Sequence, residues 1–444
     1  MPALRPDGLP ADQRRWAIMA MGLAIMMAVL DGAMTNIALP TIAAELGSTP
    51  AASIWVVNGY QLAVTVSLLP LAALGESIGY AKVFRAGLVV FLISSCACTL
   101  APSLPALISA RIMQGFGAAG IMSVNGAMLR YIHPPNALGR GIGINAMIVG
   151  TASAVGPTVA AAIYAVNIPA VLVALALSRR LPVITGSGRA FDWTSTVLNA
   201  LTLGLFILAI GSAARGQPGW LTVVQLTASV ATGVYFVRLQ LRLPAPVLPV
   251  DLLRMPVFAL SIATSILSFV SQILAYVSLP FHMQGSLGRT VVETGVLMTP
   301  WPVCTAAMAP IAGRLADRYP AGILGGVGLV VMACGLLLLA ALPLQPSSLD
   351  IAWRMAVCGI GFGFFQTPNN RAILMTAPLE RSGSAGGMLS TARLVGQTTG
   401  AALVALIFGW MGRSDTALPL VLGAGCALLG AMTSGLRLRP WAKS

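Results

Sequence analysis

Three features of the sequence predict an all-α membrane protein. Of the 444 residues, 57% are apolar and 9% are charged, and the mean hydropathy is +0.87, whereas a soluble domain carries about 25% charged residues. The apolar residues form runs of roughly 20, the length of a helix that crosses a bilayer. The basic residues gather in alternate connections between these runs, as expected for cytoplasmic loops.

The apolar runs predict fourteen membrane-spanning helices, separated mostly by short segments with charged residues, Pro or Gly. The first run extends for about 24 residues from Trp16 and lacks a small-residue cleavage site, so we expect a span and not a cleavable signal. The predicted spans are residues 16–39, 52–74, 84–102, 104–129, 139–163, 164–178, 194–214, 220–241, 256–280, 291–313, 320–343, 349–374, 384–411 and 417–437.

The distribution of positive charge predicts the orientation. With the N-terminus in the cytoplasm, twenty of the 26 Lys and Arg residues fall in cytoplasmic segments, and only four fall in outer loops. Those four are Arg215, Arg289, Arg354 and Arg413. This asymmetry predicts a multi-pass protein of the bacterial inner (cytoplasmic) membrane with both termini inside, and it requires an even number of helices.

The connection between the fifth and sixth predicted helices is atypically short. The stretch from Leu138 to Ser178 is long enough for two helices but contains no polar outer loop. The basic pair that follows at Arg179 requires a cytoplasmic exit. We therefore expect a tight reversal near Tyr164–Pro169, with Asn167 and Pro169 outside the helix because proline disfavours helix in the residue before it.

Composition and motifs exclude several classes of function. The net charge of +14 comes from scattered arginines and not from a basic patch with interleaved aromatics, so no nucleic-acid partner is expected. The two histidines, His133 and His282, lie near loops, and the chain has no HExxH motif and no P-loop, which argues against an enzyme or an ATP-driven pump. No metal or cofactor is expected, because all six cysteines lie in apolar runs without a CxxC pair: Cys96, Cys98, Cys304, Cys334, Cys358 and Cys426.

Asp31 is the most informative single residue, because it lies inside an otherwise uncharged span. An acid at the centre of a membrane helix costs about 2.5–3.5 kcal/mol on insertion scales, which marks it as a candidate functional group. Arg111 lies inside the fourth span at a similar depth, roughly 10–12 Å below the outer surface. The two are candidate partners, although a structural acid at Asp31, or an Arg111 that bonds only backbone carbonyls, remains an alternative.

Four segments resemble motifs of the major facilitator superfamily, and they occur along the chain in the same order as in that family. Residues 313–318 (Gly-Arg-Leu-Ala-Asp-Arg) resemble its loop motif, which residues 75–82 repeat in weaker form. Residues 107–117 resemble the fourth-helix motif, and residues 150–157 the fifth-helix antiporter motif. Residues 30–40 resemble the first-helix motif of the fourteen-helix drug/proton antiporters. Within that group, the chain most resembles the methyl viologen resistance exporters. The chain departs from the loop motif at Glu76, where Asp is usual, and at Tyr80 and Ala81, where basic residues are usual.

The resemblance implies a major facilitator fold: two six-helix bundles, residues 1–182 and 246–444, with two extra helices in residues 183–245 between them. It implies proton-coupled efflux by alternating access, with protons as the coupling ion. Asp31 and Arg111 would be the proton-coupling residues. The conformational motifs would comprise Gly75, Glu76, Gly79, Gln114, Gly115, Gly150, Gly156, Pro157, Gly313, Asp317 and Arg318. Asp317 would act as a latch near a helix N-terminus, with arginines nearby.

Polar and aromatic residues within the spans are candidates for the substrate cavity, although packing or interhelical hydrogen bonds explain any one of them equally well. They are Asn36, Asn58, Tyr60, Gln61, Asn125, Gln272, Tyr276 and Gln366. A buried acid and aromatic faces favour small lipophilic cations, such as quaternary ammonium compounds and viologens. We expect a monomer in the lipid bilayer. A proton-linked symporter, an exporter of an endogenous metabolite and a passive channel stay open as alternatives.

Overall fold

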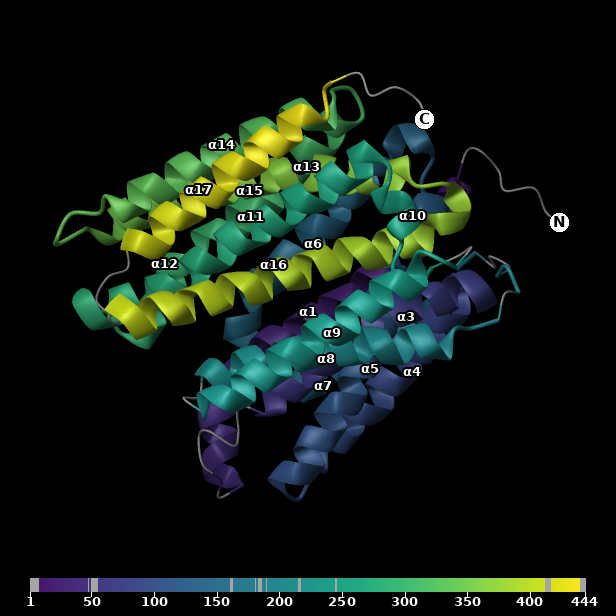
Figure 1. The fold of residues 1–444 in the computed structure, drawn as a ribbon, viewed down its shortest axis with the longest axis horizontal. Coiled ribbons are helices and arrows are strands. Elements are labelled where there is room, and N and C mark those ends of the chain that lie inside the picture. Colours follow the sequence, from purple (N-terminus) through teal and green to yellow (C-terminus); the bar gives the residue numbers. More distant parts are fainter. Residues whose placement is uncertain are drawn as a thin grey trace. The chain divides into compact units, whose positions relative to one another are not determined.

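The computed structural model describes residues 8–46, 48, 55–159, 163–179, 181–182, 186–188, 190–214, 217–243, 246–411 and 417–439 (Figure 1). The regular secondary structure in this part of the chain is all helical, without a β-strand. Helices suit a bilayer because every backbone hydrogen bond is made within the segment. The all-α membrane fold predicted from the sequence is confirmed.

Each predicted span coincides with helical structure in the described part of the chain. In the first half the helices are α1 (Ala11–Glu45), α3 (Trp55–Ile78), α4 (Tyr80–Thr99), α5 (Leu104–Ile132), α6 (Leu138–Val159) and α7 (Ile163–Ser178). Then follow α8 (Trp193–Ala214), α9 (Gly219–Gln240) and the short α10 (Val250–Leu253). In the second half they are α11 (Pro256–Phe281), α12 (Val291–Met298), α13 (Pro300–Ala316), α14 (Ala321–Ala340), α15 (Ser348–Thr376), α16 (Ser382–Met411) and α17 (Ala417–Leu436).

Ten helices of the described part are long and apolar enough to cross a membrane. In α7 and α8 the described apolar stretches, Ile168–Ser178 and Trp193–Ala209, are shorter. The tenth predicted span divides into α12 and α13 at Thr299, directly before Pro300. A capping box begins α12, in which the Thr290 hydroxyl accepts from Glu293 N and the Glu293 carboxylate accepts from Thr290 N.

The reversal predicted at Tyr164–Pro169 is wrong. Helix α7 already begins at Ile163 and keeps Pro169 inside it, so Asn167 and Pro169 do not leave the helix. A proline inside a membrane helix is tolerated where neighbouring groups satisfy the freed carbonyl. The connection between α6 and α7 falls at residues 160–162, outside the described residues.

The chain forms two compact units whose boundaries differ from the predicted domains. Unit 1 comprises residues 1–135, 155–251 and 377–390, and unit 2 comprises residues 136–154, 252–376 and 391–444. The inserted helices α8 and α9 therefore belong to unit 1, and α6 and α16 each contribute to both units.

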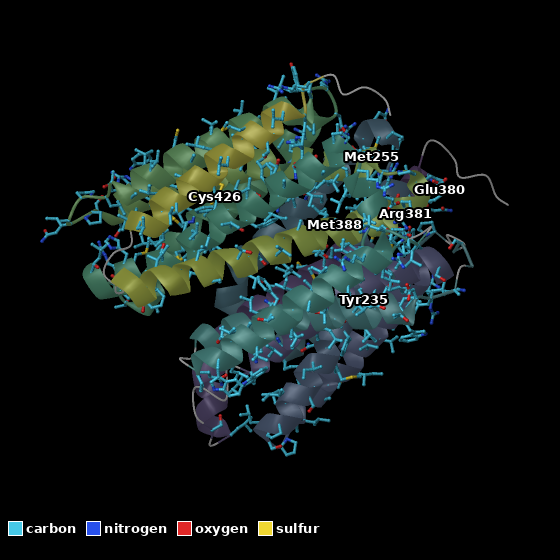
Figure 2. All side chains as sticks on the ribbon, in the orientation of Figure 1. Tyr235, Met255, Glu380, Arg381, Met388 and Cys426 are labelled. Carbon is cyan, nitrogen blue, oxygen red and sulfur yellow. The ribbon has the colours of Figure 1, made fainter. Side chains whose placement is uncertain are left out.

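Within unit 1, α5 packs against α3 and α4, and α8 packs against α9 and α3. Small residues let α4 and α5 approach closely, since a Cβ at Gly117 would lie 2.5 Å from the Phe91 nitrogen. Helix α9 exposes much of its apolar surface, including Tyr235, labelled in Figure 2. Such a surface suits contact with lipid.

Within unit 2, α14 packs against α15 and α17, and α11 packs against α17 (Figure 1). Its core contains Trp301, Met332 and Phe365, each at most 1% exposed. Glycines again permit close approach, because a Cβ at Gly328 would lie 2.6 Å from the Phe365 nitrogen.

Candidate functional site

A buried ion pair joins α1 and α5 in unit 1. Arg111 Nη1 donates to Asp31 Oδ2 at 2.5 Å, and the two side chains are 3% and 1% exposed. The predicted partnership of Asp31 and Arg111 is confirmed as a contact. Two charges buried at this depth are tolerated because each compensates the other.

Gln114 extends this pair into a polar cluster. Its Nε2 donates to Asp31 Oδ1 at 3.1 Å and to Ser95 Oγ at 2.9 Å, while its Oε1 accepts from Arg111 Nη1 at 2.6 Å. Gln114 and Ser95 are fully buried. Sequence reasoning placed Gln114 among the conformational motifs but gave no role to Ser95, because a serine in an apolar run has no distinguishing signal.

Tyr60 belongs to the same cluster and not to an open aromatic surface. The Arg111 guanidinium lies over its ring, 4.5 Å from the centroid, and its hydroxyl donates to the Ala28 carbonyl. The side chain is 4% exposed. One face of the ring is therefore covered by a protein cation, and Tyr60 stays a prediction for the substrate cavity.

Residues 75–82, at the junction of α3 and α4 and called here the Glu76 loop, bind the N-terminus of α16. Glu76 Oε1 accepts from Ser384 N at 2.6 Å, and the Tyr80 hydroxyl accepts from Gly383 N at 3.1 Å. The first N–H groups of a helix lack partners within it and carry partial positive charge, so an acid is stabilising there. The departure from the family pattern at Tyr80 thus supplies a second acceptor to the same helix end.

Arg381, labelled in Figure 2, lies in the turn before α16 and connects the loop to α10. It contacts Glu76 Oε2 at 3.4 Å, Asp251 Oδ1 at 3.0 Å and the Pro246 carbonyl at 3.1 Å. The segment after the inserted helices is therefore held beside Glu76.

The segment before the inserted helices contacts the same end of α3. Ser187 N donates to the Glu76 carbonyl at 2.8 Å, and Gly188 N donates to the Ser77 carbonyl at 3.0 Å. The last carbonyls of a helix have no partner within it, so these bonds cap α3. The turn from α3 into α4 is made at Gly79, whose φ of +107° favours glycine.

The Asp317 loop in unit 2 repeats the arrangement of the Glu76 loop. Asp317 Oδ1 accepts from Gly139 N, at the start of α6, at 3.0 Å and from Arg371 Nε at 3.1 Å. A carboxylate at a helix N-terminus is the geometry predicted for a latch. The arginine that contacts it is Arg371 of α15, whereas the side chain of Arg318 is exposed.

The glycines of the predicted motifs lie at close contacts between helices. A Cβ at Gly115 would lie 2.6 Å from the Tyr60 carbonyl, at Gly150 2.9 Å from Ala306 Cβ, and at Gly313 2.5 Å from the Gly139 carbonyl. A Cβ at Gly75 would lie 2.8 Å from the Tyr80 ring. Gly156 and Pro157 fall in the last turns of α6, whose side chains are outside the described residues.

The remaining cavity candidates differ in their exposure. Gln61 is exposed, and partly exposed side chains occur at Asn58, Asn125, Gln272, Tyr276 and Gln366. Tyr276 packs edge-on against Trp301 at 5.1 Å between centroids. The side chain of Asn36 lies outside the described residues. These residues stay predictions for the cavity.

A second buried polar cluster, which sequence reasoning missed, lies in unit 2. Arg437 donates to Asn369 Oδ1 at 2.7 Å and to Ser261 Oγ at 2.9 Å, and also contacts the Ser434 hydroxyl. It joins α11, α15 and the end of α17. The positive-inside count treated Arg437 only as a loop charge, and its burial could not be read from that position.

The described residues contain no group of three or more His, Cys, Asp or Glu side chains that could hold a metal ion. Arg111, Gln114 and Asp31 instead form a buried, hydrogen-bonded cluster that contains a single carboxylate. The arrangement contains neither a nucleophile–base pair nor paired carboxylates among its members.

Comparison with known proteins identifies the family. Residues 21–401 match the sequence profile of the Major Facilitator Superfamily. The chain is 51% identical to the uncharacterized transporter YebQ of Escherichia coli, over 99% of this chain and 98% of that protein. It is 27% identical to the riboflavin transporter RibZ of Clostridioides difficile (89% of each chain) and 29% identical to the multidrug resistance protein Stp of Mycobacterium tuberculosis (89% of this chain, 76% of Stp). The chain is a multi-pass membrane transporter, not an enzyme, and belongs to the major facilitator superfamily.

Proposed function

We propose that this transporter exports small lipophilic cations in exchange for protons, from an inner membrane in which both of its termini face the cytoplasm. The observation that carries the proposal is the buried Asp31–Arg111–Gln114 cluster inside the helical bundle of unit 1. An ionisable pair within the membrane region is a proton or substrate site by default. The multidrug resistance protein Stp, a relative, supports export of foreign compounds.

The chemistry follows from the pair. The Asp31 carboxylate accepts from Arg111 on one oxygen and from Gln114 on the other. When Asp31 takes up a proton, the ion pair is lost and α1 and α5 are held together less tightly. Release of the proton restores the pair. Such a local change can bias two alternating states of a transporter, provided that the states hold the pair differently.

The first prediction is that Asp31→Asn abolishes transport driven by a pH gradient, because the amide cannot exchange a proton. Proteoliposomes with an imposed pH gradient and tetraphenylphosphonium as the probe measure this directly. Asp12→Asn, at the exposed start of the same helix α1, is the matched control and should transport normally.

Three results would contradict the proposal. A folded Asp31→Asn variant that transports at the normal rate would remove Asp31 from coupling. Movement of the probe in the same direction as the protons would indicate a symporter. Transport of riboflavin but of no cation tested, as the relationship to RibZ also suggests, would replace the substrate class and leave the coupling site in place.

A further inference from the structure

The contact between α4 and α5 places two α4 side chains against Gln114. A Cβ at Gly120 would lie 2.9 Å from the Gly87 Cα, so the two backbones are in direct contact beside this region. Ser95 is fully buried and Cys98 is 6% exposed. Both reach Gln114, with Ser95 Oγ 2.9 Å from Nε2 and Cys98 Sγ 3.7 Å from Oε1.

These contacts determine which way the Gln114 amide points. The Ser95 hydroxyl donates to the Phe91 carbonyl at 2.7 Å, so its oxygen is available to accept from Gln114 Nε2. Both Nε2 hydrogens are then used, one on Ser95 and one on Asp31, and Oε1 accepts from Arg111 and Cys98. A rotated amide would turn its NH₂ group toward the Arg111 donors and its oxygen toward the Asp31 carboxylate.

We propose that Ser95 is a positioning residue for the proton site, which acts through Gln114 to keep an N–H donor on Asp31 Oδ1. The inference rests on the proposed function of Asp31. A donor on a carboxylate favours its ionised form, so the orientation of Gln114 sets the pH at which Asp31 takes up a proton. Ser95 touches neither the proton nor the substrate.

Among the described residues, the charged and titratable groups in contact with the Asp31 cluster come from three helices. Helix α5 contributes Arg111, α3 contributes Tyr60 and α4 contributes Cys98. Helix α7 also packs against α1, and its residues 168–178, whose side chains are described, contain no charged or titratable group. Replacing Ser95 leaves each of these groups in place, so a change in titration would report on Gln114.

The experiment is an infrared pH titration of the full chain in lipid. The carbonyl band of a protonated carboxyl group is assigned to Asp31 by its loss in Asp31→Asn. In Ser95→Ala the amide loses one acceptor and can rotate, so we expect the midpoint of this band to move to higher pH, by roughly 0.5–1 unit. Ser95→Thr keeps the hydroxyl and should restore the midpoint, and Ser95→Cys should lie between them.

The neighbouring serine provides the control. Ser94 is 3% exposed, and its hydroxyl donates to the carbonyls of Val90 and Phe91 in its own helix. Ser94→Ala should therefore titrate like the unchanged protein. An unmoved midpoint in Ser95→Ala, or an equal shift in Ser94→Ala, overturns the proposal. Because the band is measured without substrate, this failure is distinct from normal transport by Asp31→Asn, which overturns the proposed function instead.

Discussion

Arg111 is the residue on which the buried cluster of unit 1 depends. Its guanidinium contacts Asp31, Gln114 and the Val56 carbonyl, and it lies over the Tyr60 ring. It thus connects α1, α3 and α5 through one side chain. A planar fork with several donors can make these contacts at once, whereas a lysine ammonium has no such fixed geometry.

Removing Arg111 should destabilise the protein more than removing both charges. Arg111→Gln leaves the Asp31 carboxylate buried without its cation, which typically costs about 3–5 kcal/mol. In Arg111→Gln with Asp31→Asn, no charge remains to be compensated, so the melting temperature should recover part of the loss. Thermal unfolding in detergent at neutral pH compares these two variants with the unchanged protein. A double variant no more stable than Arg111→Gln would show that packing, and not the buried charge, sets the cost.

At the scale of helices, both halves use an acid to hold the N-terminus of a long helix. Glu76 accepts from Ser384 N of α16 in unit 1, and Asp317 accepts from Gly139 N of α6 in unit 2. Each acid also contacts an arginine, Arg381 or Arg371. The longer Glu76 side chain therefore fills the role that Asp317 fills in the repeat.

Gly186 allows the segment before α8 to cap α3. A Cβ at this position would overlap the Ser77 carbonyl and lie 2.7 Å from the Gly79 nitrogen. We predict that Gly186→Ala displaces the segment and breaks the bonds from Ser187 N and Gly188 N, each worth about 1 kcal/mol. Amide hydrogen exchange at Ser187 and Gly188 should become faster, and the melting temperature should fall.

Gly219 at the start of α9 provides the matched control, because a Cβ there meets nothing within 4 Å. Gly219→Ala should leave both exchange and melting temperature unchanged. If Gly186→Ala behaves like this control, the segment does not cap α3 in the membrane-embedded protein.

The sequence predicts the helices well and the site only in part, for physical reasons. A run of apolar residues with the length of a bilayer leaves little choice but a helix, and α7 covers the predicted sixth span, residues 164–178, although the reversal expected at its start was wrong. Asp31 and Arg111 stood out because charge inside a span is rare. The sequence did not single out Ser95, Asn369 and Arg381. Their roles depend on which helices pack side by side, and the apolar periodicity of one helix does not predict its neighbours.

At the scale of the molecule, contacts within unit 1 agree with the orientation predicted from charge. In unit 1, Glu76, Ser187, Asp251 and Arg381 all belong to segments assigned to the cytoplasm, and they contact one another at the end of α3. Arg85 also donates to the Ser178 carbonyl at 3.0 Å, which joins the start of α4 to the end of α7. Helix α7 therefore ends on the side where α4 begins, as an even number of crossings requires.

This topology makes a last prediction about exposure on the two sides of the membrane. Ser348 is the first residue of α15, at the end assigned to the outside, and Ser187 lies in a segment assigned to the cytoplasm; both residues are exposed. With the six native cysteines replaced, Ser348→Cys should react with a membrane-impermeant maleimide in intact cells. Ser187→Cys should react only after the inner membrane is opened, because both the positive-inside rule and the contact with Glu76 place it inside. Labelling of Ser187→Cys in intact cells, with Ser348→Cys protected, would invert the topology. Labelling of both from outside would mean that an even number of crossings, and not the predicted five, separates Ser187 from Ser348, so that one of the helices from α8 to α14 would fail to cross the membrane.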